Sequence, residues 1–476
     1  MEELPSAATA CRASPFTPGR LVRGAVLLAA AAGAALCWAG LLAADLEPAG
    51  RAALGVTSLA VGLWASEALA LPTTALLAMT LLYVAGAVPR IEQAFVGFAS
   101  PVLFFLLGSA GLGIAAEHSG LADRLAGWLL VRSRGSGWRL LLELLLSLPL
   151  QALVIPSAIS RNAVLVPIYD RVLVRLGRPP ALGAAVMLTL GVLGPLASSA
   201  LLSGGISPVA AAHAIGGFTW PTWLVAVAPP YYVLLALGGV AVWLFARPER
   251  EVVAAEQVDV VHPSARWRPA EWRVAAVSVA TALLWMLDQL THWPPAVPAL
   301  LALVVLLTPR LGVMSWGVFS REAPWATCLV LAGAVSLAEA LTSSGAAAWL
   351  AGALFGSLPV PDAAAPQALV IFLVMGLITL AIPNRAAAIT LGVPLAAAYA
   401  SGGELSAAAA GLVVMIVADA MTIYPAQTAA NLLAYDRGYF TAGQLARFNL
   451  MTLLLAAAVV VAVALPWWSL VGLPGG

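Results

Sequence analysis

Two short segments decide the fold of this chain: IPSAISRNAVLVP (residues 155–167) and IPNRAAAITLGVP (residues 382–394). Both begin with Ile-Pro, and in both a second proline follows after ten further residues. Each segment lies inside a long apolar stretch, where a proline ends or kinks a helix. An arginine follows each break, Arg161 in the first segment and Arg385 in the second. The pattern predicts two helical hairpins, each with a charged residue near its tip.

The composition indicates that these hairpins lie in a membrane. Of 476 residues, 62% are hydrophobic and 9% are charged, against roughly 25% charged in an ordinary soluble domain. Runs such as 24–44, 54–71 and 73–88 are nearly uncharged and about as long as a spanning helix, roughly 17 to 25 residues. We therefore expect an all-α polytopic membrane protein with about 11 transmembrane helices. Tryptophans near the expected span ends are interpreted as an interfacial belt, among them Trp220, Trp223, Trp467 and Trp468.

The basic residues indicate an orientation in the membrane. All 23 are arginines, and 19 of them fall on one side if the N-terminus is cytoplasmic. Arg51 and Arg90 fall on the outer side, while Arg161 and Arg385 interrupt apolar segments. The distribution predicts a cytoplasmic N-terminal tail at 1–23, a C-terminus outside, and location in the cell (inner) membrane.

The two halves of the chain share a pattern. Gly108 and Ser119 recur as Gly333 and Ser344, both at an offset of 225 residues. The first hairpin has basic residues at both ends and the second has none at either end, so the first is expected to enter from the cytoplasm and the second from outside, as inverted repeats predict. The expected division is a first repeat at 24–247 with a hairpin at about 138–175, a cytoplasmic linker at 248–273, and a second repeat at 274–476 with a hairpin at about 365–400. Each repeat is expected to contain a broken helix, at 198–208 and 419–428.

Several motifs along the chain resemble those of one transporter family. They are WASEA (residues 64–68) before Leu71-Pro72, FASP (98–101), SGLADR (119–124) and PAQTAAN (425–431), which runs into Tyr435. In this order they resemble the divalent anion/sodium symporter family, which carries dicarboxylates, citrate or sulfate. The resemblance covers most of the chain.

The resemblance implies a homodimer in which a transport part moves against a scaffold part like an elevator. It also implies Ser-Asn-Thr at each hairpin tip, binding sodium and touching substrate carboxylates. This chain reads PSAISRN (156–162) and PNRAA (383–387) at those places. The departure argues against sodium dependence and favours sodium-independent exchange or proton coupling. Sodium ions and protons are the two candidate coupling ions. No other cofactor is implied.

Polar residues near the tips and the helix breaks are the candidate site. The expected substrate-binding residues are Ser157, Ser160, Arg161, Asn162, Ser207, Asn384, Arg385 and Thr428, with Asp419 as a candidate for the coupling ion. A charged residue at the bilayer centre is costly and marks a functional site by default. The two arginines are expected to supply the positive charge that sodium supplies in relatives, and to bind carboxylates with their guanidinium forks.

A structural reading of the same residues stays open. The arginines can instead bond carbonyls at their own hairpin breaks, or pair with a carboxylate such as Asp419, Glu339 or Glu67. The serines and asparagines can cap half-helices. His213 has no other potential metal ligands near it in the sequence, so a structural role is expected for it.

The leading functional hypothesis is secondary active transport of small divalent or polycarboxylate anions. One alternative is another oxyanion, such as sulfate or arsenite, or sodium/proton exchange on the same fold. Another is a membrane scaffold or enzyme without transport. The sequence contains no zinc-ligand cluster and no nucleophilic triad, so an enzyme is not expected. With net charge +1 and no soluble domain, nucleic acid is not an expected partner; the expected partners are a small anion, the lipid bilayer and a second copy.

Overall fold

The chain is entirely helical in the part that the structure describes. This computed structural model describes residues 20–66, 68–121, 124, 136–154, 158–248, 267–287, 291–356, 358, 360–381, 385–423 and 428–473. Within these residues, the helices long and apolar enough to cross a membrane are Pro180–Ser199, Trp220–Ala246, Trp325–Ser343 and Ala442–Val471. The all-α class with several apolar spans is confirmed. The count of about 11 transmembrane helices stays a prediction.

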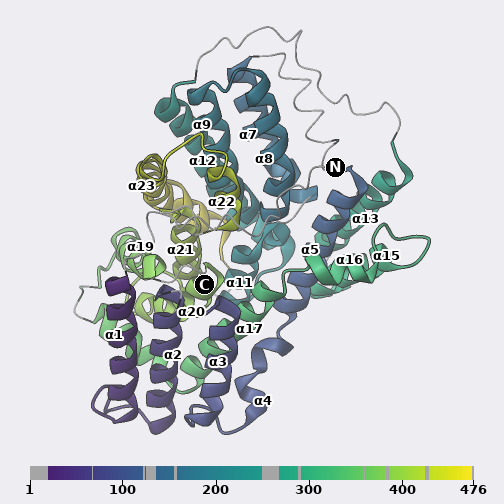
Figure 1. Cartoon of the computed structure of the whole chain (residues 1–476). Helices are drawn as coiled ribbons and strands as arrows, with labels where there is room; N and C mark the ends of the chain where they lie inside the picture. Colours follow the sequence, from purple (N-terminus) through teal and green to yellow (C-terminus); the bar gives the residue numbers. More distant parts are fainter. Residues whose placement is uncertain are drawn as a thin grey trace.

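The first half of the chain forms two groups of helices (Figure 1). Helices α1, α2 and α3 pack side by side at one end of the molecule, and α7, α8, α9 and α12 lie at the other. The elements are α1 (Arg20–Trp38), α2 (Pro48–Ser66), α3 (Leu71–Val84), α4 (Ile91–Ala94), η1 (Val96–Ala99), α5 (Pro101–Ser119), α7 (Gly137–Val154), α8 (Ala158–Arg175), α9 (Pro180–Leu188), η2 (Thr189–Leu193), α10 (Gly194–Ser199), η3 (Leu202–Gly204), α11 (Ile206–Ile215) and α12 (Trp220–Ala246).

The second half packs around both groups. Its helix α17 contacts α3, and its helix α23 contacts α12. The elements are α13 (Pro269–Met286), α15 (Ala296–Leu307), α16 (Trp316–Glu322), α17 (Trp325–Ser343), α18 (Ala346–Phe355), α19 (Ala364–Ala381), α20 (Arg385–Ala400), α21 (Ala407–Ala420), α22 (Ala429–Tyr435), α23 (Ala442–Val459), η6 (Val460–Ala464) and α24 (Leu465–Val471).

The expected hairpins correspond to two helix pairs. Helix α7 contacts α8, and α19 contacts α20. The predicted tips at 155–157 and 382–384 lie outside the described residues. The helix that ends at Ser199 resumes at Ile206, and the helix that ends at Ala420 is followed by α22, which begins at Ala429. The proposed division into inverted repeats, with its boundaries and linker, stays a prediction.

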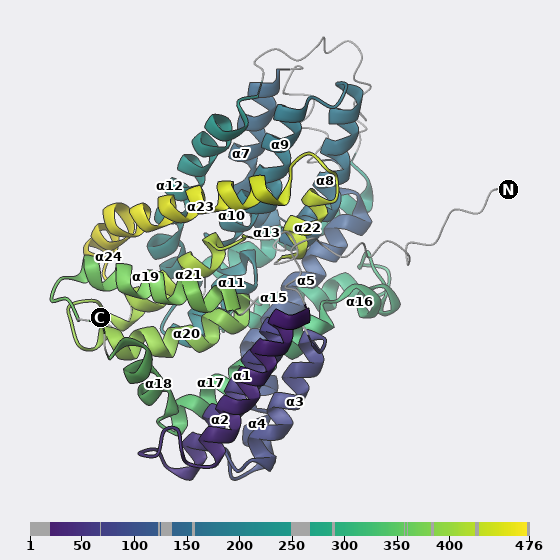
Figure 2. The same ribbon diagram turned by 60° about the vertical axis from the view of Figure 1, so that its left-hand side comes forward.

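After each interruption the chain packs against the hairpin of the other half. Helix α11 contacts α20 and α21, whereas α22 contacts α8 and η2. Both views show α22 beside α8 and α11 near α20 and α21 (Figures 1 and 2). Segments more than 150 residues apart in the sequence, such as α8 and α22, therefore meet around the two arginine-bearing helices.

Burial separates a central span from a peripheral one. The helix Pro180–Ser199 is 94% buried, whereas Ala442–Val471 is 39% buried although it is the more apolar of the two. A helix that is apolar on all sides is either enclosed by protein or faces lipid. The first of these helices is enclosed by neighbours, and the second exposes an apolar face.

Two tryptophans complete a proline-interrupted helix rather than anchoring the chain at a membrane surface. Pro229 and Pro230 lie inside α12 and have no N–H, so they leave the carbonyls of Val225 and Ala226 without helical partners. The indole Nε1 of Trp467 donates to the Val225 carbonyl at 2.8 Å, and that of Trp468 donates to the Ala226 carbonyl at 2.9 Å.

The interpretation of these tryptophans as an interfacial belt is therefore wrong for three of the four. Trp220, Trp223 and Trp468 are buried, and an aromatic anchor at the interface needs its ring at the headgroup level. The position of these tryptophans near span ends did not predict that two of them donate hydrogen bonds to carbonyls of α12.

Candidate functional site

Arg161 joins the first hairpin to the end of the following helix. It lies in the first turn of α8, and its side chain is fully buried. Its Nη2 donates to the Gly194 carbonyl at 2.8 Å and to the Ser198 hydroxyl at 2.7 Å. Bonds from a charged donor are stronger than those between neutral groups. Arg161 therefore ties α8 to both ends of α10.

Asn162 supplies a hydrogen bond that a proline cannot make. Residues 189–193 form a π-helical turn, in which the Gly194 N–H bonds the Thr189 carbonyl. In the same register the next N–H would bond the Leu190 carbonyl, but the next residue is Pro195. The Asn162 Nδ2 donates to the Leu190 carbonyl at 2.9 Å and to the Ala430 carbonyl at 3.0 Å. One amide thus holds α8, η2 and α22 together.

Arg385 has a different environment. It is the first residue of α20, and its side chain is 13% exposed. Its Nη2 donates to the Thr422 hydroxyl at 2.5 Å, and its Nη1 lies 4.0 Å from the Asp419 Oδ1. Its Nε is buried and has no hydrogen-bond acceptor in the described part of the chain. The guanidinium therefore retains a donor, the Nε, that no described residue uses.

Asp419 faces Arg385 from α21 and is 1% exposed. Its Oδ2 accepts a hydrogen bond from the Tyr231 hydroxyl on α12 at 2.9 Å. Its Oδ1 has no hydrogen-bond donor among the described residues. Of the three carboxylates considered as arginine partners, Asp419 lies at Arg385, Glu339 is exposed on α17, and Glu67 is outside the described residues.

The segment after α21 is fixed from α23. The Thr422 N–H donates to the Asn449 Oδ1 at 2.9 Å, and the Asn449 Nδ2 donates to the Ala420 carbonyl at 2.7 Å. A buried side-chain amide thus satisfies the backbone where α21 ends. This positions the Thr422 hydroxyl that Arg385 bonds.

The two arginines make equivalent hydroxyl contacts. Each uses Nη2, and each bonds a hydroxyl 37 residues further along the chain, Ser198 in one half and Thr422 in the other. The different spacing of the two arginines from their Ile-Pro sequences does not disturb this equivalence. In the second half an acid also lies close, because the Asp419 Oδ1 is 4.0 Å from the Arg385 Nη1.

The remaining candidates are placed as follows. Thr428 caps α22, its hydroxyl accepting from the Asn431 N–H at 3.2 Å. Ser207 is buried in the first turn of α11. Ser157 and Asn384 lie outside the described residues, as does the side chain of Ser160.

Asn431 is a buried polar residue that the sequence analysis did not select. Its side chain is fully buried, and neither its Oδ1 nor its Nδ2 has a hydrogen-bond partner within the described ranges. The Oδ1 of the neighbouring Asn162 is likewise buried without a partner there. Buried polar atoms are satisfied in most proteins, and exceptions call for an explanation. The signal was present in the sequence, since Asn431 closes the motif 425–431.

Three further contact residues were also missed: Ser198, Thr422 and Tyr231. Ser198 lies near the end of α10 and Thr422 follows α21, both within the expected helix breaks, but only the arginine contacts single them out from their neighbours. Tyr231 directly follows Pro229-Pro230, where a broken helix exposes backbone in an apolar segment. The Pro229-Pro230 pair could therefore have pointed to Tyr231 from the sequence.

The cytoplasmic end expected for α8 is held by a charged cluster. The Asp170 carboxylate accepts from the Tyr439 hydroxyl at 2.9 Å and lies 3.5 Å from the Arg437 Nη1 and 3.7 Å from the Arg178 Nη2. Burial and the hydrogen bond to Asp170 raise the pKa of Tyr439 to about 12. The phenol therefore keeps its proton, and its bond to α8, at neutral pH.

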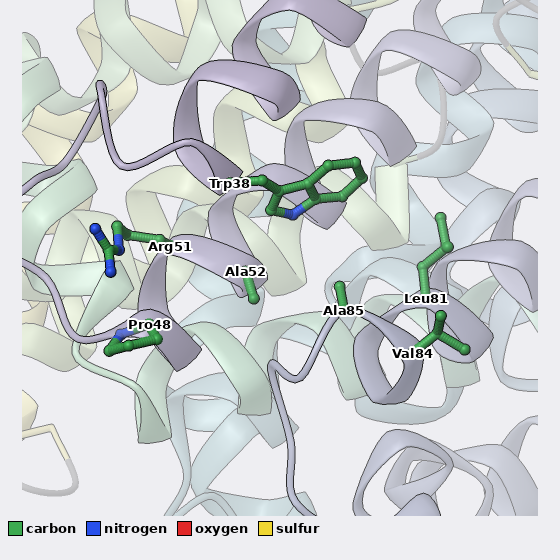
Figure 3. A pocket seen from close by; sticks show the side chains of 7 residues that line it. All are labelled: Trp38, Pro48, Arg51, Ala52, Leu81, Val84 and Ala85. Carbon is green, nitrogen blue, oxygen red and sulfur yellow. The ribbon is translucent and has the colours of Figure 1, made fainter.

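Two pockets lie away from these contacts. One, of about 420 Å³, is lined from α1, α2 and α3. Figure 3 shows Trp38 above it, Arg51 and Pro48 at one side, and Leu81 and Val84 at the other. Neither arginine of the hairpins lines it.

The other pocket, of about 160 Å³, lies between α5, α11 and the start of α15, and His213 lines it. Within the described residues, no group of three His, Cys, Asp or Glu side chains could hold a metal ion. Pocket size therefore does not single out the candidate site, which rests on the arginine contacts.

Comparison with known proteins identifies the family. A family model described as the sodium:sulfate symporter transmembrane region matches residues 23–473. A "membrane protein" of Cupriavidus necator is 25% identical over 465 residues, covering 90% of this chain and 89% of that protein. An "uncharacterized transporter" of Haemophilus influenzae is 22% identical over 449 residues, covering 89% and 93%.

One further match covers about half of a relative, and one solved structure is partly similar. The spinach (Spinacia oleracea) protein "dicarboxylate transporter 2, chloroplastic" is 25% identical over 295 residues, which cover 58% of this chain and 51% of that protein. The crystal structure of the YdaH transporter of Alcanivorax borkumensis has a TM-score of 0.45 and 18% identity, covering 80% of this chain and 87% of that one.

The family model spans nearly all of the described helices, so the resemblance inferred from the motifs is confirmed. The family consists of transporters, which removes the alternative of an enzyme. The protein is an integral membrane anion transporter, and the chain belongs to the sodium:sulfate symporter family.

Proposed function

We propose that the protein carries small divalent or polycarboxylate anions across the membrane as a secondary active transporter. The observation that supports this most is the unused donor capacity of Arg385. Its Nη2 bonds Thr422, while its buried Nε has no acceptor among the described residues and its Nη1 lies 4.0 Å from the nearest carboxylate oxygen. A guanidinium fork with free N–H groups matches the two oxygens of a carboxylate.

In this proposal Arg161 acts by its charge rather than by contact. Its side chain is fully buried and its Nη2 bonds two neutral oxygens, on Gly194 and Ser198. A fixed positive charge inside a low-dielectric region stabilises an anion nearby more strongly than the same charge in water. The other polar residues proposed to surround the anion are Ser157, Ser160, Asn162, Ser207, Asn384 and Thr428.

The proposed movement is of the elevator type. The helix pairs α7–α8 and α19–α20, with the interrupted helices α9–α11 and α21–α22, would move as a unit against α1–α5, α13, α15 and α17. The interlocking of α11 with α20 and of α22 with α8 supports a moving unit built from both halves. We further propose a homodimer in the inner cell membrane, with the N-terminus cytoplasmic and the C-terminus outside.

We propose that transport does not require sodium, because neither tip carries Ser-Asn-Thr and an arginine stands near each one. Sulfate is the second candidate substrate. The description of the family model names sulfate. A guanidinium can donate two parallel hydrogen bonds to two oxygens of an oxyanion, whether it is a carboxylate or a sulfate. Sodium/proton exchange would not need either arginine.

Uptake into proteoliposomes tests the proposal. Labelled succinate, citrate and sulfate are offered with and without a sodium gradient, to wild type, Arg385→Ala and the control Arg51→Ala. Arg51 lines the pocket between α1, α2 and α3, away from the hairpins. We expect saturable uptake of a carboxylate without sodium, lowered about tenfold or more by Arg385→Ala, since a charged hydrogen bond contributes about 1.5 to 3 kcal/mol.

The opposite outcomes are equally clear. Sodium-dependent uptake that survives Arg385→Ala would contradict the role of the arginine. Uptake of sulfate without any carboxylate would select the second candidate. Size-exclusion profiles of the purified variants separate lost transport from lost folding.

A further inference from the structure

Asp419 is a buried carboxylate that its surroundings satisfy only in part. Oδ2 accepts from the Tyr231 hydroxyl at 2.9 Å, whereas Oδ1 has no donor in the described residues. The distance of 4.0 Å from Oδ1 to the Arg385 Nη1 is longer than a hydrogen bond. An ionised carboxylate away from water depends on its partner, and removing the partner favours the protonated form. The charge of Asp419 therefore depends on Arg385.

Within the described helices around α21, Arg385 is the charged group that faces Asp419. Among the described residues of the elements packed against α21, Arg385 comes from α20 and Tyr231 from α12. His213 on α11 is exposed and interacts electrostatically with Glu339, and Arg447 on α23 is exposed. Helices α19 and α10 contribute no titratable side chain. Arg385 and Tyr231 are thus the titratable groups that lie next to the Asp419 carboxylate in the described part of the chain.

We propose that Asp419 and a substrate carboxylate compete for Arg385, and that Asp419 takes up a proton when the substrate displaces it. This rests on the proposed function, and it names the coupling ion as a proton. The ion pair between Asp419 and Arg385 breaks, the substrate carboxylate pairs with Arg385, and one proton from solution bonds to the Asp419 Oδ1. The pairing carboxylate brings one negative charge to Arg385 and the proton removes one from Asp419, so the charge next to Arg385 is unchanged, while the second carboxylate of the substrate adds its own charge to the loaded carrier.

Release reverses these steps on the other side of the membrane. The substrate leaves Arg385, Asp419 gives its proton to water, and the carboxylate pairs with Arg385 again. In the empty carrier Arg385 is again paired with Asp419, as in the present structure. The carrier therefore returns without an unpaired buried charge. Tyr231 is a positioning residue, because its hydroxyl donates to Oδ2 and this bond is compatible with both protonation states.

The first test is succinate accumulation driven by a proton gradient, without sodium and with the membrane voltage clamped at zero. For wild type we expect about tenfold accumulation per unit of pH difference, the ratio that one coupled proton supplies. Asp419→Asn replaces the carboxylate with a neutral amide that cannot bind or release a proton. We expect this variant to exchange internal for external succinate at equal pH, and to lose accumulation driven by the proton gradient. Glu339→Gln, the same change at an exposed acid on α17, should behave as wild type.

A second variant separates positioning from structure. Tyr231→Phe removes the donor to Oδ2, so the carboxylate loses the hydrogen bond that positions it and that favours its charged form. The midpoint of the pH profile for uptake should move about one unit in the alkaline direction. A lower rate with an unmoved midpoint would show a structural role only, and would overturn the assignment of Tyr231.

Binding measurements keep the proposal falsifiable if a variant does not fold. Calorimetric titration of detergent-purified wild type with succinate, in two buffers of different ionisation enthalpy, should give about one proton taken up for each succinate bound. Binding without proton uptake would overturn the coupling. Gradient-driven accumulation that persists in Asp419→Asn would overturn it as well and leave anion transport standing. If wild type neither binds nor moves any of the three anions, the proposed function falls and this inference with it.

Discussion

The surroundings of Arg161 and Arg385 differ in a way that their shared contact does not suggest. Both arginines bond a hydroxyl 37 residues downstream through Nη2. Arg161 adds a backbone carbonyl and is fully buried, whereas Arg385 adds a loosely placed carboxylate and is 13% exposed. The two arginines therefore share one hydrogen bond but differ in their other contacts and in their exposure. Arg161 connects α8 to α10, whereas we propose that Arg385 contacts the substrate.

The largest expected effect is on the stability of the first half. Arg161→Ala removes both bonds to α10 and leaves a cavity in a fully buried place, so the free energy of unfolding should fall by about 2 to 5 kcal/mol. Arg385→Ala, with its partly exposed side chain, should lose less. Thermal unfolding of both purified variants checks this. Equal losses would break the comparison between the two arginines.

Arg385→Lys should lower the rate of carboxylate uptake about tenfold, with little change in thermal stability. Lysine keeps the positive charge near Asp419 but presents no planar fork. Initial rates at several substrate concentrations separate weaker binding from slower transport. Unchanged kinetics would mean that charge alone is used, as we propose for Arg161.

Asn431→Leu should raise the free energy of unfolding by about 1 kcal/mol and still lower uptake. Its amide is buried with no partner in the described ranges, so the protein gives up solvation of the amide without gaining a bond. A polar group kept at such a cost is explained by contact with a ligand or ion. Chemical unfolding and uptake measured on the same preparation test both parts. A less stable variant would contradict the interpretation that the amide is unsatisfied.

The smallest effect concerns the helix that presents Tyr231. Trp468→Phe removes the buried donor to the Ala226 carbonyl and should lower the free energy of unfolding by about 1 kcal/mol. Trp467→Phe is the matched control, because its bond to the Val225 carbonyl is exposed to solvent. Its loss should be smaller, since water replaces the donor. Thermal unfolding of the pair measures the difference, and the reverse order would contradict this account of α12.

Much of the general class followed from the sequence. The low charge content predicts a helical membrane protein, and the motif order predicts the transporter family, because both depend on residues near one another in the chain. Arg161 and Arg385 stood out for the same local reason, as charges in apolar segments. The partners did not, since Ser198, Thr422 and Tyr231 gain meaning only from contacts across 37 to 188 residues.

The sequence by itself determined that this chain spans a membrane, where its helices are interrupted and which charges need an explanation. These properties follow from hydrophobicity and proline chemistry, which act over a few residues. Only the tertiary structure decided what each charge touches. The packing of α8 on α10 brings Arg161 to the Gly194 carbonyl and the Ser198 hydroxyl. The arrangement of α12, α20 and α21 brings Arg385, Asp419 and Tyr231 together. Burial and distance set the electrostatics of such groups, and neither is a property of local sequence.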